Sequence, residues 1–434
     1  MNKKNLYIET YGCQMNFSDS EIVASVLKDE YNVIDQPKDA DLILINTCSI
    51  RDHAEQRVLK RLTELNTLKK KNHQLRIGLI GCMAERMKDE LFKTGKVDLV
   101  VGPDAYRDFL KILDEETDFP MNVLLSEIET YDDIEPVRYD TNGVSAFISI
   151  MRGCNNFCAY CVVPYTRGRE RSRNPETIIA EAEKLFTEGY REITLLGQNV
   201  NSFSYNGFNF ANLMAAMAKI NPLLRLRFAT SHPKDLSNEL LEVMACYPNI
   251  CKSIHLPAQS GSNKILQLMN RKYTREWYLD RIAHIRKYMP DCAVSTDFIA
   301  GFSNETEADH ADTLSLMRAV GFDYAFMFKY SLREGTSAHK NLEDNVPEEV
   351  KTRRLEEIIA LQQALSHQSN KADVGKTFEI LIEGVSKRSA AHFYGRNSQN
   401  KVVVFPKGER KIGEYINVCI KKCTSATLMG EMVE

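Results

Sequence analysis

The chain has 434 residues, 43% of them hydrophobic and 26% charged, and its formal net charge is −3. This length allows roughly two to four domains, and the charge balance excludes a uniformly basic nucleic-acid coat. The sequence has no apolar run of about eighteen residues, which excludes a transmembrane helix, and no apolar leader, so we expect a cytoplasmic protein. Eleven cysteines in such a chain indicate metal or cluster ligation, or catalysis, rather than disulfides.

Residues 1–120 alternate short β-type runs with helical stretches. The expected strands are residues 5–10, 42–46, 76–80 and 99–101. Between them, Val58, Leu62 and Leu65 recur with helical periodicity. This alternation is typical of an α/β domain with a doubly wound parallel sheet. The polar residues 121–145 are expected to form a linker.

Residues 146–371 repeat the β-then-α rhythm. The expected strands are residues 146–152, 192–196, 225–230, 253–256, 293–299 and 325–330. Asn174 and Pro175 suit the cap and first position of the first helix, and a last helix is expected at about residues 347–369. The six strand–helix units predict an open, partial (β/α)6 barrel rather than the closed eight-unit form.

Residues 372–434 change character to short β runs separated by turns. The expected strands are residues 377–383, 392–396, 401–405, 415–422 and 428–433. This pattern predicts a small β-barrel of the oligonucleotide-binding kind. From Lys376 onward ten Lys and Arg stand against six Glu, with Phe393, Tyr394 and Phe405 among them. Basic residues interleaved with aromatic rings favour RNA, because phosphates supply affinity and bases stack on rings.

Cys154, Cys158 and Cys161 form a C-x3-C-x2-C motif directly after the first expected barrel strand. Three thiolates on one loop can bind three corners of a 4Fe–4S cluster and leave the fourth iron open to a small molecule. Gly153 allows the backbone to approach closely. The alternative is a zinc knuckle or unliganded thiols, although structural zinc usually takes four protein ligands and no fourth Cys or His lies nearby in sequence.

Cys13, Cys48 and Cys82 form a second set, and each follows an expected strand of the first domain. Residues just past the carboxyl ends of parallel strands lie along one edge of the sheet, where doubly wound folds bind ligands. The three cysteines are therefore expected to converge on a second cluster. The alternative is three buried thiols that pack as small hydrophobic side chains.

The first motif, at the end of a barrel's first strand, resembles that of the radical S-adenosylmethionine (SAM) superfamily. With the second trio and the basic tail, the chain resembles the methylthiotransferases, in which an N-terminal auxiliary-cluster domain precedes a radical SAM domain and a C-terminal TRAM domain. Several segments look like the tRNA-modifying MiaB branch, and Ser49-Ile50-Arg51 discriminates most from sister branches. These segments are residues 11–16, 46–51, 161–168, 196–201 and 231–233.

One segment departs from the family pattern. Where the family usually has Gly-Phe-Pro-Gly-Glu-Thr after the fifth barrel strand, residues 301–306 read Gly-Phe-Ser-Asn-Glu-Thr. The loss of Pro and Gly leaves the shape of that turn open.

The resemblance implies a transferase that replaces the hydrogen on C2 of N6-isopentenylated adenosine 37 of tRNA with a methylthio group. That C–H bond has no useful acidity, so a general base cannot remove it, and no protein acid or base is expected to be catalytic. In the family, the open iron of the first cluster binds SAM, which is cleaved to a 5′-deoxyadenosyl radical. The second cluster supplies a sulfur that another SAM methylates. The implied cofactors are two 4Fe–4S clusters and two SAM per turnover, the partner is tRNA, and we expect a monomer that needs unidentified electron and sulfur donors.

Binding of SAM requires polar side chains at the carboxyl ends of the barrel strands. The candidates are Tyr160, Gln198, Asn199, Ser231, Gln259 and Asp297. His232 and His255 also follow expected strands. For each polar residue, the alternative is a cap or a turn in the loop.

Contact with tRNA is expected from basic residues in two places. The candidates are Arg167, Arg169, Arg171, Arg173, Lys387, Arg388, Arg396, Lys421 and Lys422. The planar guanidinium fork of the four arginines suits phosphate or carboxylate groups. The alternative is a solvated face that pairs with acids such as Glu170 and Glu176.

Two other functions compete with this interpretation. One is a methylthiotransferase that acts on a ribosomal-protein residue or on threonylcarbamoyladenosine in tRNA. The other is a non-catalytic RNA-binding protein in which metal sites are purely structural. Iron content and SAM cleavage separate the second alternative from an enzyme, and analysis of tRNA nucleosides separates the first.

Overall fold

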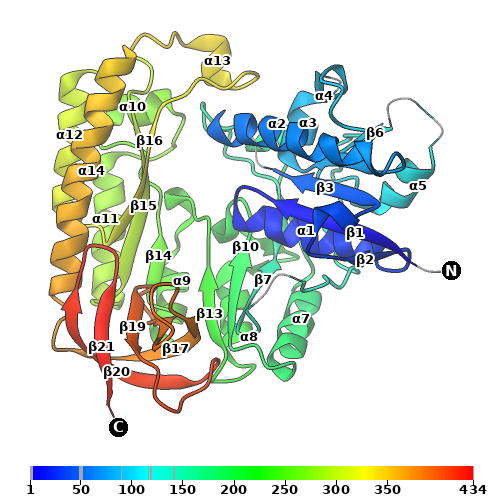
Figure 1. Ribbon diagram of the computed structural model, residues 1–434. Coiled ribbons are helices and arrows are strands. Elements are labelled where there is room, and N and C mark those ends of the chain that lie inside the picture. Colours follow the sequence, from blue (N-terminus) through cyan, green and yellow to red (C-terminus); the bar gives the residue numbers. More distant parts are fainter. Residues whose placement is uncertain are drawn as a thin grey trace.

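The computed structural model describes residues 3–47, 52–88, 90–115, 117, 120–139 and 142–433, and only the backbone of residues 52–55. Three parts follow one another along the chain: a parallel α/β sheet, a partial barrel and a small closed barrel (Figure 1). No described helix has both the length and the apolar character needed to cross a bilayer.

The N-terminal part is a six-stranded, all-parallel sheet of order β2-β1-β3-β4-β5-β6. Its strands are β1 (Lys4–Thr10), β2 (Tyr31–Val33), β3 (Leu42–Asn46), β4 (Arg76–Ile80), β5 (Leu99–Val101) and β6 (Met121–Asn122). Its helices are α1 (Gln14–Leu27), α2 (Asp52–Asn66), α3 (Cys82–Met87), α4 (Glu90–Lys93) and α5 (Phe109–Asp114). The sheet packs helices on both faces, with one apolar cluster around Leu6 and Leu44 and another around Ile43 and Ile45. The doubly wound prediction is confirmed.

The segment predicted to be a linker is packed into the protein. Its first two residues, Met121 and Asn122, pair with β5 as the sixth strand. Tyr131 is 2% exposed and its hydroxyl donates to the carbonyl of Pro103 (2.9 Å). Arg138 forms ion pairs with Glu21 of α1 and Glu181 of the next part. The segment therefore fastens the first part to the second.

The central part contains two parallel three-stranded sheets of order β7-β10-β13 and β14-β15-β16, which a bridge between Leu226 and Ile250 connects. Its main strands are β7 (Ser145–Ser149), β10 (Glu192–Leu196), β13 (Arg225–Phe228), β14 (Ser253–His255), β15 (Ala293–Ala300) and β16 (Tyr324–Lys329). Short pairs form from β8 (Met151–Arg152) with β9 (Arg171–Ser172) and from β11 (Ser204–Tyr205) with β12 (Phe208–Asn209). The expected six-stranded open barrel is confirmed.

Helices cover the outside of this partial barrel (Figure 1). The helices of the central part are α6 (Val163–Thr166), α7 (Pro175–Thr187), α8 (Phe210–Ala218), α9 (Asn238–Cys246), α10 (Asn263–Leu268), α11 (Arg275–Tyr288), α12 (Glu307–Val320), α13 (Ser337–Asn341) and α14 (Glu348–Lys371). Two of them are not part of the outer layer: α6 packs against α3 of the N-terminal part, and α13 lies at the top of Figure 1. The predicted start of α7 is confirmed, because the Asn174 side chain accepts a hydrogen bond from the backbone N–H of Glu176 (3.0 Å) and Pro175 is the first helical residue.

The C-terminal part is a closed five-stranded barrel of order β17-β18-β19-β21-β20, as predicted. Its strands are β17 (Thr377–Val385), β18 (His392–Arg396), β19 (Val402–Pro406), β20 (Tyr415–Cys423) and β21 (Leu428–Val433). Phe393 and Phe405 pack inside it, at 2% and 0% exposure. The expectation that these two rings stack on RNA bases is therefore wrong, because they form the barrel core.

The small barrel docks at the amino-terminal ends of the central strands. Glu192, the first residue of β10, is buried and pairs with Arg227 (2.8 Å) and with Arg396 of β18 (2.6 Å). Arg225 Nη1 also donates to the carbonyl of Arg396 (2.7 Å). The cysteine loop lies at the opposite edge, where the central strands have their carboxyl ends.

Candidate functional site

The loop that carries the C-x3-C-x2-C motif follows β7 and β8 and is held by backbone contacts. The N–H of Cys154 donates to the carbonyl of Gly168 (3.1 Å) and that of Cys161 to the carbonyl of Cys158 (2.9 Å). Gly153 has φ +77°, and a Cβ there would lie 1.9 Å from the carbonyl oxygen of Arg169. Only glycine fits this position, because the left-handed backbone and the neighbouring loop at Gly168 and Arg169 both exclude a side chain.

The three thiols of this loop lie together in a buried environment. Cys154 is 8% and Cys158 9% exposed. Burial raises the pKa of Cys154 to about 11 and raises that of Cys161, whose pKa is raised further by the charge on Cys158. Buried, mutually repelling thiolates are favourable only when a metal compensates their charge. The loop therefore fits an iron–sulfur cluster.

Arg271, which sequence reasoning missed, also reaches this loop. It is 4% exposed, and its Nη1 lies 3.2 Å from the Sγ of Cys158 and 3.4 Å from the hydroxyl of Tyr160. Its Nε donates to the hydroxyl of Tyr273 (2.9 Å). No local pattern marks this residue, because it follows Cys158 by 113 positions.

Three of the residues predicted near SAM present buried polar atoms without a partner among the described residues. They are Ser231 Oγ, His232 Nε2 and Gln259 Oε1. Burial, with the charge of Arg271, lowers the pKa of His232 to about 2, so the imidazole is neutral. Because Nδ1 accepts from the N–H of Lys234 (3.3 Å), Nε2 carries the proton and is an unused donor. A buried polar atom without a hydrogen bond raises the free energy of the folded state. We therefore expect a polar ligand to form hydrogen bonds with these three atoms.

Gln259 is in addition held in a constrained conformation. Its φ is +67°, its N–H donates to the carbonyl of Asp297 (2.8 Å), and its carbonyl accepts from Ile299 (3.0 Å). A non-glycine residue at positive φ is uncommon and marks functional positions. The backbone conformation of Gln259, fixed by these two hydrogen bonds, therefore sets the direction of its side chain.

The other predicted SAM residues have protein partners. Gln198 Oε1 accepts from the N–H of Gly153 (2.5 Å) and so supports the cysteine loop. Asn199 is 1% exposed, donates to Asp235 (2.7 Å) and accepts from the N–H of His232 (3.0 Å). Asp297 lies 3.4 Å from Nε2 of His255, and the ring of Tyr160 packs edge-on against Phe302. Gln198 and Asn199 thus shape the site through its loops.

Replacing Gln259 with leucine is expected to raise the KM for SAM about tenfold with little change in kcat, because one hydrogen bond to the ligand is worth about 1.4 kcal/mol. The matched control is Gln363→Leu on α14, an exposed glutamine outside the cleft beside the cysteine loop. The measurement is SAM cleavage at varied SAM concentration without tRNA. An unchanged KM in Gln259→Leu would show that this side chain does not contact SAM.

The described members of the second trio, Cys13 and Cys82, lie at the carboxyl edge of the N-terminal sheet. Cys13 follows β1 and precedes α1, and Cys82 is the first residue of α3 after β4. Burial raises the pKa of Cys82, and the charge on Cys13 raises it further. Cys48 lies outside the described residues. The preceding Thr47 accepts a hydrogen bond from the N–H of Met83, next to Cys82 (3.3 Å). Two of the three predicted ligands are therefore brought together.

Among the described residues no three His, Cys, Asp or Glu side chains converge closely enough to hold one metal ion. A single-ion zinc site needs ligands that converge on one point, whereas each cysteine of a 4Fe–4S cluster binds a different iron.

The four arginines after the first motif have different surroundings. Arg169 is exposed, with its guanidinium over the ring of Phe157. Arg171 and Arg173 are 7% and 6% exposed and pair with Asp104 and with Asp132, respectively. Arg167 is 2% exposed and its Nε lies 3.0 Å from the Sγ of Cys82. Three of the four therefore lie inside the protein and not on a solvated face.

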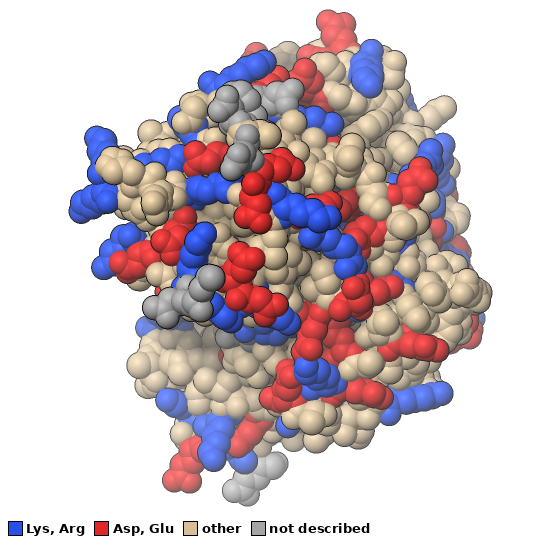
Figure 2. Space-filling model, turned by 90° about the vertical axis from the view of Figure 1, so that its right-hand side faces the viewer, with Lys and Arg blue, Asp and Glu red and all other residues tan. Residues whose placement is uncertain are grey.

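Most of the predicted basic residues of the tail lie at the surface. Lys387, Arg388, Lys421 and Lys422 are exposed, whereas Arg396 is paired with Glu192 and Glu383. The face of the N-terminal part in Figure 2 carries Lys and Arg intermixed with Asp and Glu. The exposed basic candidates are thus Arg169 and the four tail residues.

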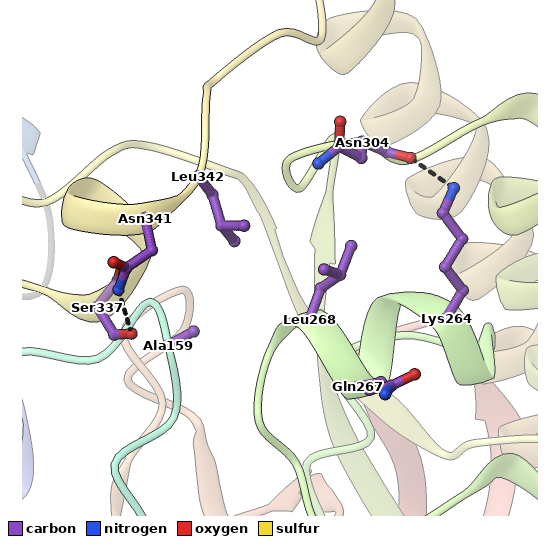
Figure 3. Close-up of a pocket in the computed structure, with 8 residues that line it drawn as sticks. All are labelled: Ala159, Lys264, Gln267, Leu268, Asn304, Ser337, Asn341 and Leu342. Atoms are coloured by element: carbon purple, nitrogen blue, oxygen red, sulfur yellow. Dashed lines mark hydrogen bonds between the residues drawn. The ribbon is translucent and has the colours of Figure 1, made fainter.

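A cleft of about 600 Å³ lies beside the cysteine loop, and its wall includes Ala159 of that loop (Figure 3). Lys264 of α10 lies on the wall of this cleft, and its Nζ donates a hydrogen bond to the carbonyl of Asn304 (2.8 Å). Asn304 stands where the family usually has glycine and has φ +63°. Asparagine tolerates this left-handed region, and Thr306 caps α12 with a capping box, so the turn keeps a glycine-like conformation.

Glu85 on α3 lies close to the second trio and is 3% exposed. Burial raises its pKa from 4.5 to about 7, against the opposing charge of Lys88. The folded chain binds the Glu85 proton more tightly than the unfolded chain does. The protonated carboxyl therefore contributes to stability at low pH, and this contribution is lost as the pH rises through about 7. Glu85→Gln is expected to stabilise the metal-free chain by about 1–2 kcal/mol near pH 8 and hardly at all near pH 5. Urea unfolding at both pH values measures this, and an equal effect at both would contradict it.

Comparison with known proteins identifies three family matches along the chain. Residues 5–102 match "Uncharacterized protein family UPF0004", residues 148–317 match the radical SAM superfamily, and residues 371–433 match the TRAM domain. Proteins named tRNA-2-methylthio-N(6)-dimethylallyladenosine synthase are similar over the full length. The one from Bacteroides fragilis is 57% identical over 438 residues, 99% of this chain and 96% of the relative. The one from Parabacteroides distasonis is 55% identical over 439 residues, 100% of this chain and 96% of the relative.

Solved structures share the fold at low sequence identity. The radical SAM methyltransferase TsrM from Kitasatospora setae superposes with a TM-score of 0.59 at 12% identity, over 78% of this chain and 75% of that one. The cobalamin-dependent radical SAM enzyme OxsB has a TM-score of 0.51 at 14% identity, over 83% of this chain and 56% of that one. These likenesses show that the chain shares its fold with these proteins over most of its length.

Proposed function

Because the chain belongs to the family of tRNA-2-methylthio-N(6)-dimethylallyladenosine synthases, we propose that it carries out their reaction on tRNA. It is a radical SAM methylthiotransferase that attaches a methylthio group to C2 of the N6-isopentenylated adenosine at position 37. The observation that carries this function is the 57% identity over 99% of the chain. A cytoplasmic location, where tRNA is processed, belongs to the same proposal.

Two 4Fe–4S clusters belong to the proposal, one on Cys154, Cys158 and Cys161 and one on the second trio. The fit rests on the buried thiols, on the close backbone approach at Gly153 and on the convergence of Cys13 with Cys82. When bound, the first cluster with SAM supplies the radical chemistry that an unreactive C–H bond needs, and the second supplies sulfur.

The protein's own part is to bind and orient the reactants. Gln198 holds the N–H of Gly153 and so sets the shape of the loop that presents the three thiols. His232 Nε2–H and Gln259 Oε1 supply a donor and an acceptor for the polar groups of SAM. The neutral state of His232 keeps it from repelling the positive sulfonium of SAM.

Contact with tRNA is proposed for the exposed basic residues, Arg169 near the first cluster and Lys387, Arg388, Lys421 and Lys422 on the small barrel. That barrel docks at the strand ends opposite to the cysteine loop. A tRNA that reaches both would lie across the molecule, with its modified base at the loop and its backbone on the barrel.

The test is complementation of a strain that lacks the enzyme, followed by mass spectrometry of its tRNA nucleosides. The wild-type gene is expected to restore 2-methylthio-N6-isopentenyladenosine, and Cys154→Ala to leave the unmethylthiolated nucleoside. Restoration by Cys154→Ala, or a methylthio group on another nucleoside or on a protein, would overturn the proposal.

A further inference from the structure

Five buried ionic side chains connect the N-terminal sheet domain to the cysteine loop. Arg152 Nη1 donates to Asp19 Oδ1 (2.9 Å) and Arg167 Nη2 to Asp19 Oδ2 (2.6 Å). Arg171 Nη2 bonds both carboxylate oxygens of Asp104 at 2.9 Å, and Arg152 Nε lies 3.5 Å from Asp104. None of the five is more than 9% exposed. We call these residues the interface network.

The interface network carries an excess of positive charge. Its three guanidinium groups, which stay protonated in proteins, face two carboxylates. The nearby Glu85 forms its own pair with Lys88 (3.3 Å) and does not cancel the excess. An uncompensated buried charge costs several kcal/mol, so the described residues leave a place for an anion.

Arg167 shows where that anion belongs. Its Nε lies 3.0 Å from the Sγ of Cys82, and its Nη1 is buried with no hydrogen-bond partner among the described residues. The charge on Cys13 also acts on this guanidinium. Arg167 is 2% exposed, which excludes it as a contact for a tRNA phosphate on the surface.

The same residue is tied to the first cysteine loop. Arg167 directly follows α6, and its backbone N–H donates to the carbonyl of Val163, the first residue of that helix (2.8 Å). Val163 comes two residues after Cys161. The carbonyl of Gly168, the residue after Arg167, accepts from the N–H of Cys154 (3.1 Å). Arg167 is thus anchored beside one trio while its side chain reaches the other.

We propose that Arg167 is a positioning residue for the second cluster: its Nε–H and its Nη1–H, which has no partner among the described residues, bond the sulfur atoms of that cluster and balance its negative charge. This inference rests on the proposed function. Three thiolates around a 4Fe–4S core leave roughly one net negative charge, which matches the excess of the interface network. Hydrogen bonds to cluster sulfurs and a nearby cation stabilise the reduced, more negative state and so raise the reduction potential.

The test isolates the second cluster and measures its potential. Cys154, Cys158 and Cys161 are all replaced with alanine, the full chain is reconstituted anaerobically, and the potential is read from an electron paramagnetic resonance redox titration. Adding Arg167→Gln is expected to weaken electron uptake at least tenfold, a drop of about 59 mV for a one-electron couple. Arg167→Lys, which keeps the charge, is expected to recover part of the shift. The matched control is Arg173→Gln, a buried interface arginine bonded to Asp132 and Glu181, and it is expected to leave the potential unchanged.

Should Arg167→Gln fail to fold, Arg167→Met removes the same charge and both donors while an apolar chain fills the buried space, and the same drop is expected. Asp19 keeps Arg152 as its partner in this variant. A potential that stays within error of the parent in the folded variant overturns the role of Arg167 and leaves the proposed function intact. An equal drop in Arg173→Gln overturns it as well, because the effect would then be structural. A parent chain that binds no cluster overturns the two-cluster proposal itself.

Discussion

Cys82→Ala is expected to stop methylthiolation while SAM cleavage to 5′-deoxyadenosine continues within about twofold of the wild-type rate. Cys82 belongs to the sheet domain, and no contact of its Sγ reaches the three thiols of the first loop among the described residues. Iron in the reconstituted protein is expected to fall from roughly eight to roughly four atoms per chain, because one 4Fe–4S cluster is lost. The measurements are iron content, release of 5′-deoxyadenosine, and methylthiolated nucleoside in isopentenylated tRNA.

The control for that experiment is Cys251→Ala. Cys251 is also a buried cysteine, at 3% exposure, but it lies at the docking surface of the small barrel, with neighbouring charges on Arg227 and Arg225. It is expected to keep both activities and all the iron. If Cys82→Ala lost SAM cleavage and methylthiolation in equal measure, the two trios would not have separate roles.

Much of the fold could be predicted because its strands are short, apolar and fully buried. The predicted strands 42–46 and 76–80 match β3 and β4, whose residues are nearly all buried. The strands Tyr31–Val33 and Met121–Asn122 were missed because they are short edge strands with partly exposed side chains. Edge strands carry weak patterns, since only one neighbour and one face constrain them.

The residues of the candidate site also fall into those that the sequence predicts and those that only the tertiary structure shows. Spacing predicts the cysteine loop, since its three thiols are close in sequence, and topology predicts that Cys13 and Cys82 share a sheet edge. The partners of Arg167 could not be predicted, because Asp19 and Cys82 are 148 and 85 positions away. A run of alternating arginines is typical of a charged surface, and only the tertiary packing shows that Arg171 and Arg173 are buried. Buried ion pairs between domains leave no local signal in a sequence.

Gly153→Ala is expected to abolish both SAM cleavage and methylthiolation and to prevent loading of the first cluster. The new Cβ would meet the carbonyl oxygen of Arg169 at 1.9 Å and that of Gly168 at 2.7 Å, both backbone atoms that cannot move aside cheaply. Since Gly168 also accepts the N–H of Cys154, any shift that relieves the clash displaces a cluster ligand. Strain at this φ adds about 1–3 kcal/mol.

Gly189→Ala separates the steric effect at Gly153 from simple backbone strain. Gly189 also has positive φ, +105°, but a Cβ there would meet nothing within 4 Å. It is expected to lower stability by about 1–3 kcal/mol, measured by urea unfolding, and to keep the iron content and both activities. Full iron loading and normal SAM cleavage in Gly153→Ala would mean that the loop reaches its cluster-binding form without the close approach to Arg169, and the assignment of the first site would have to change.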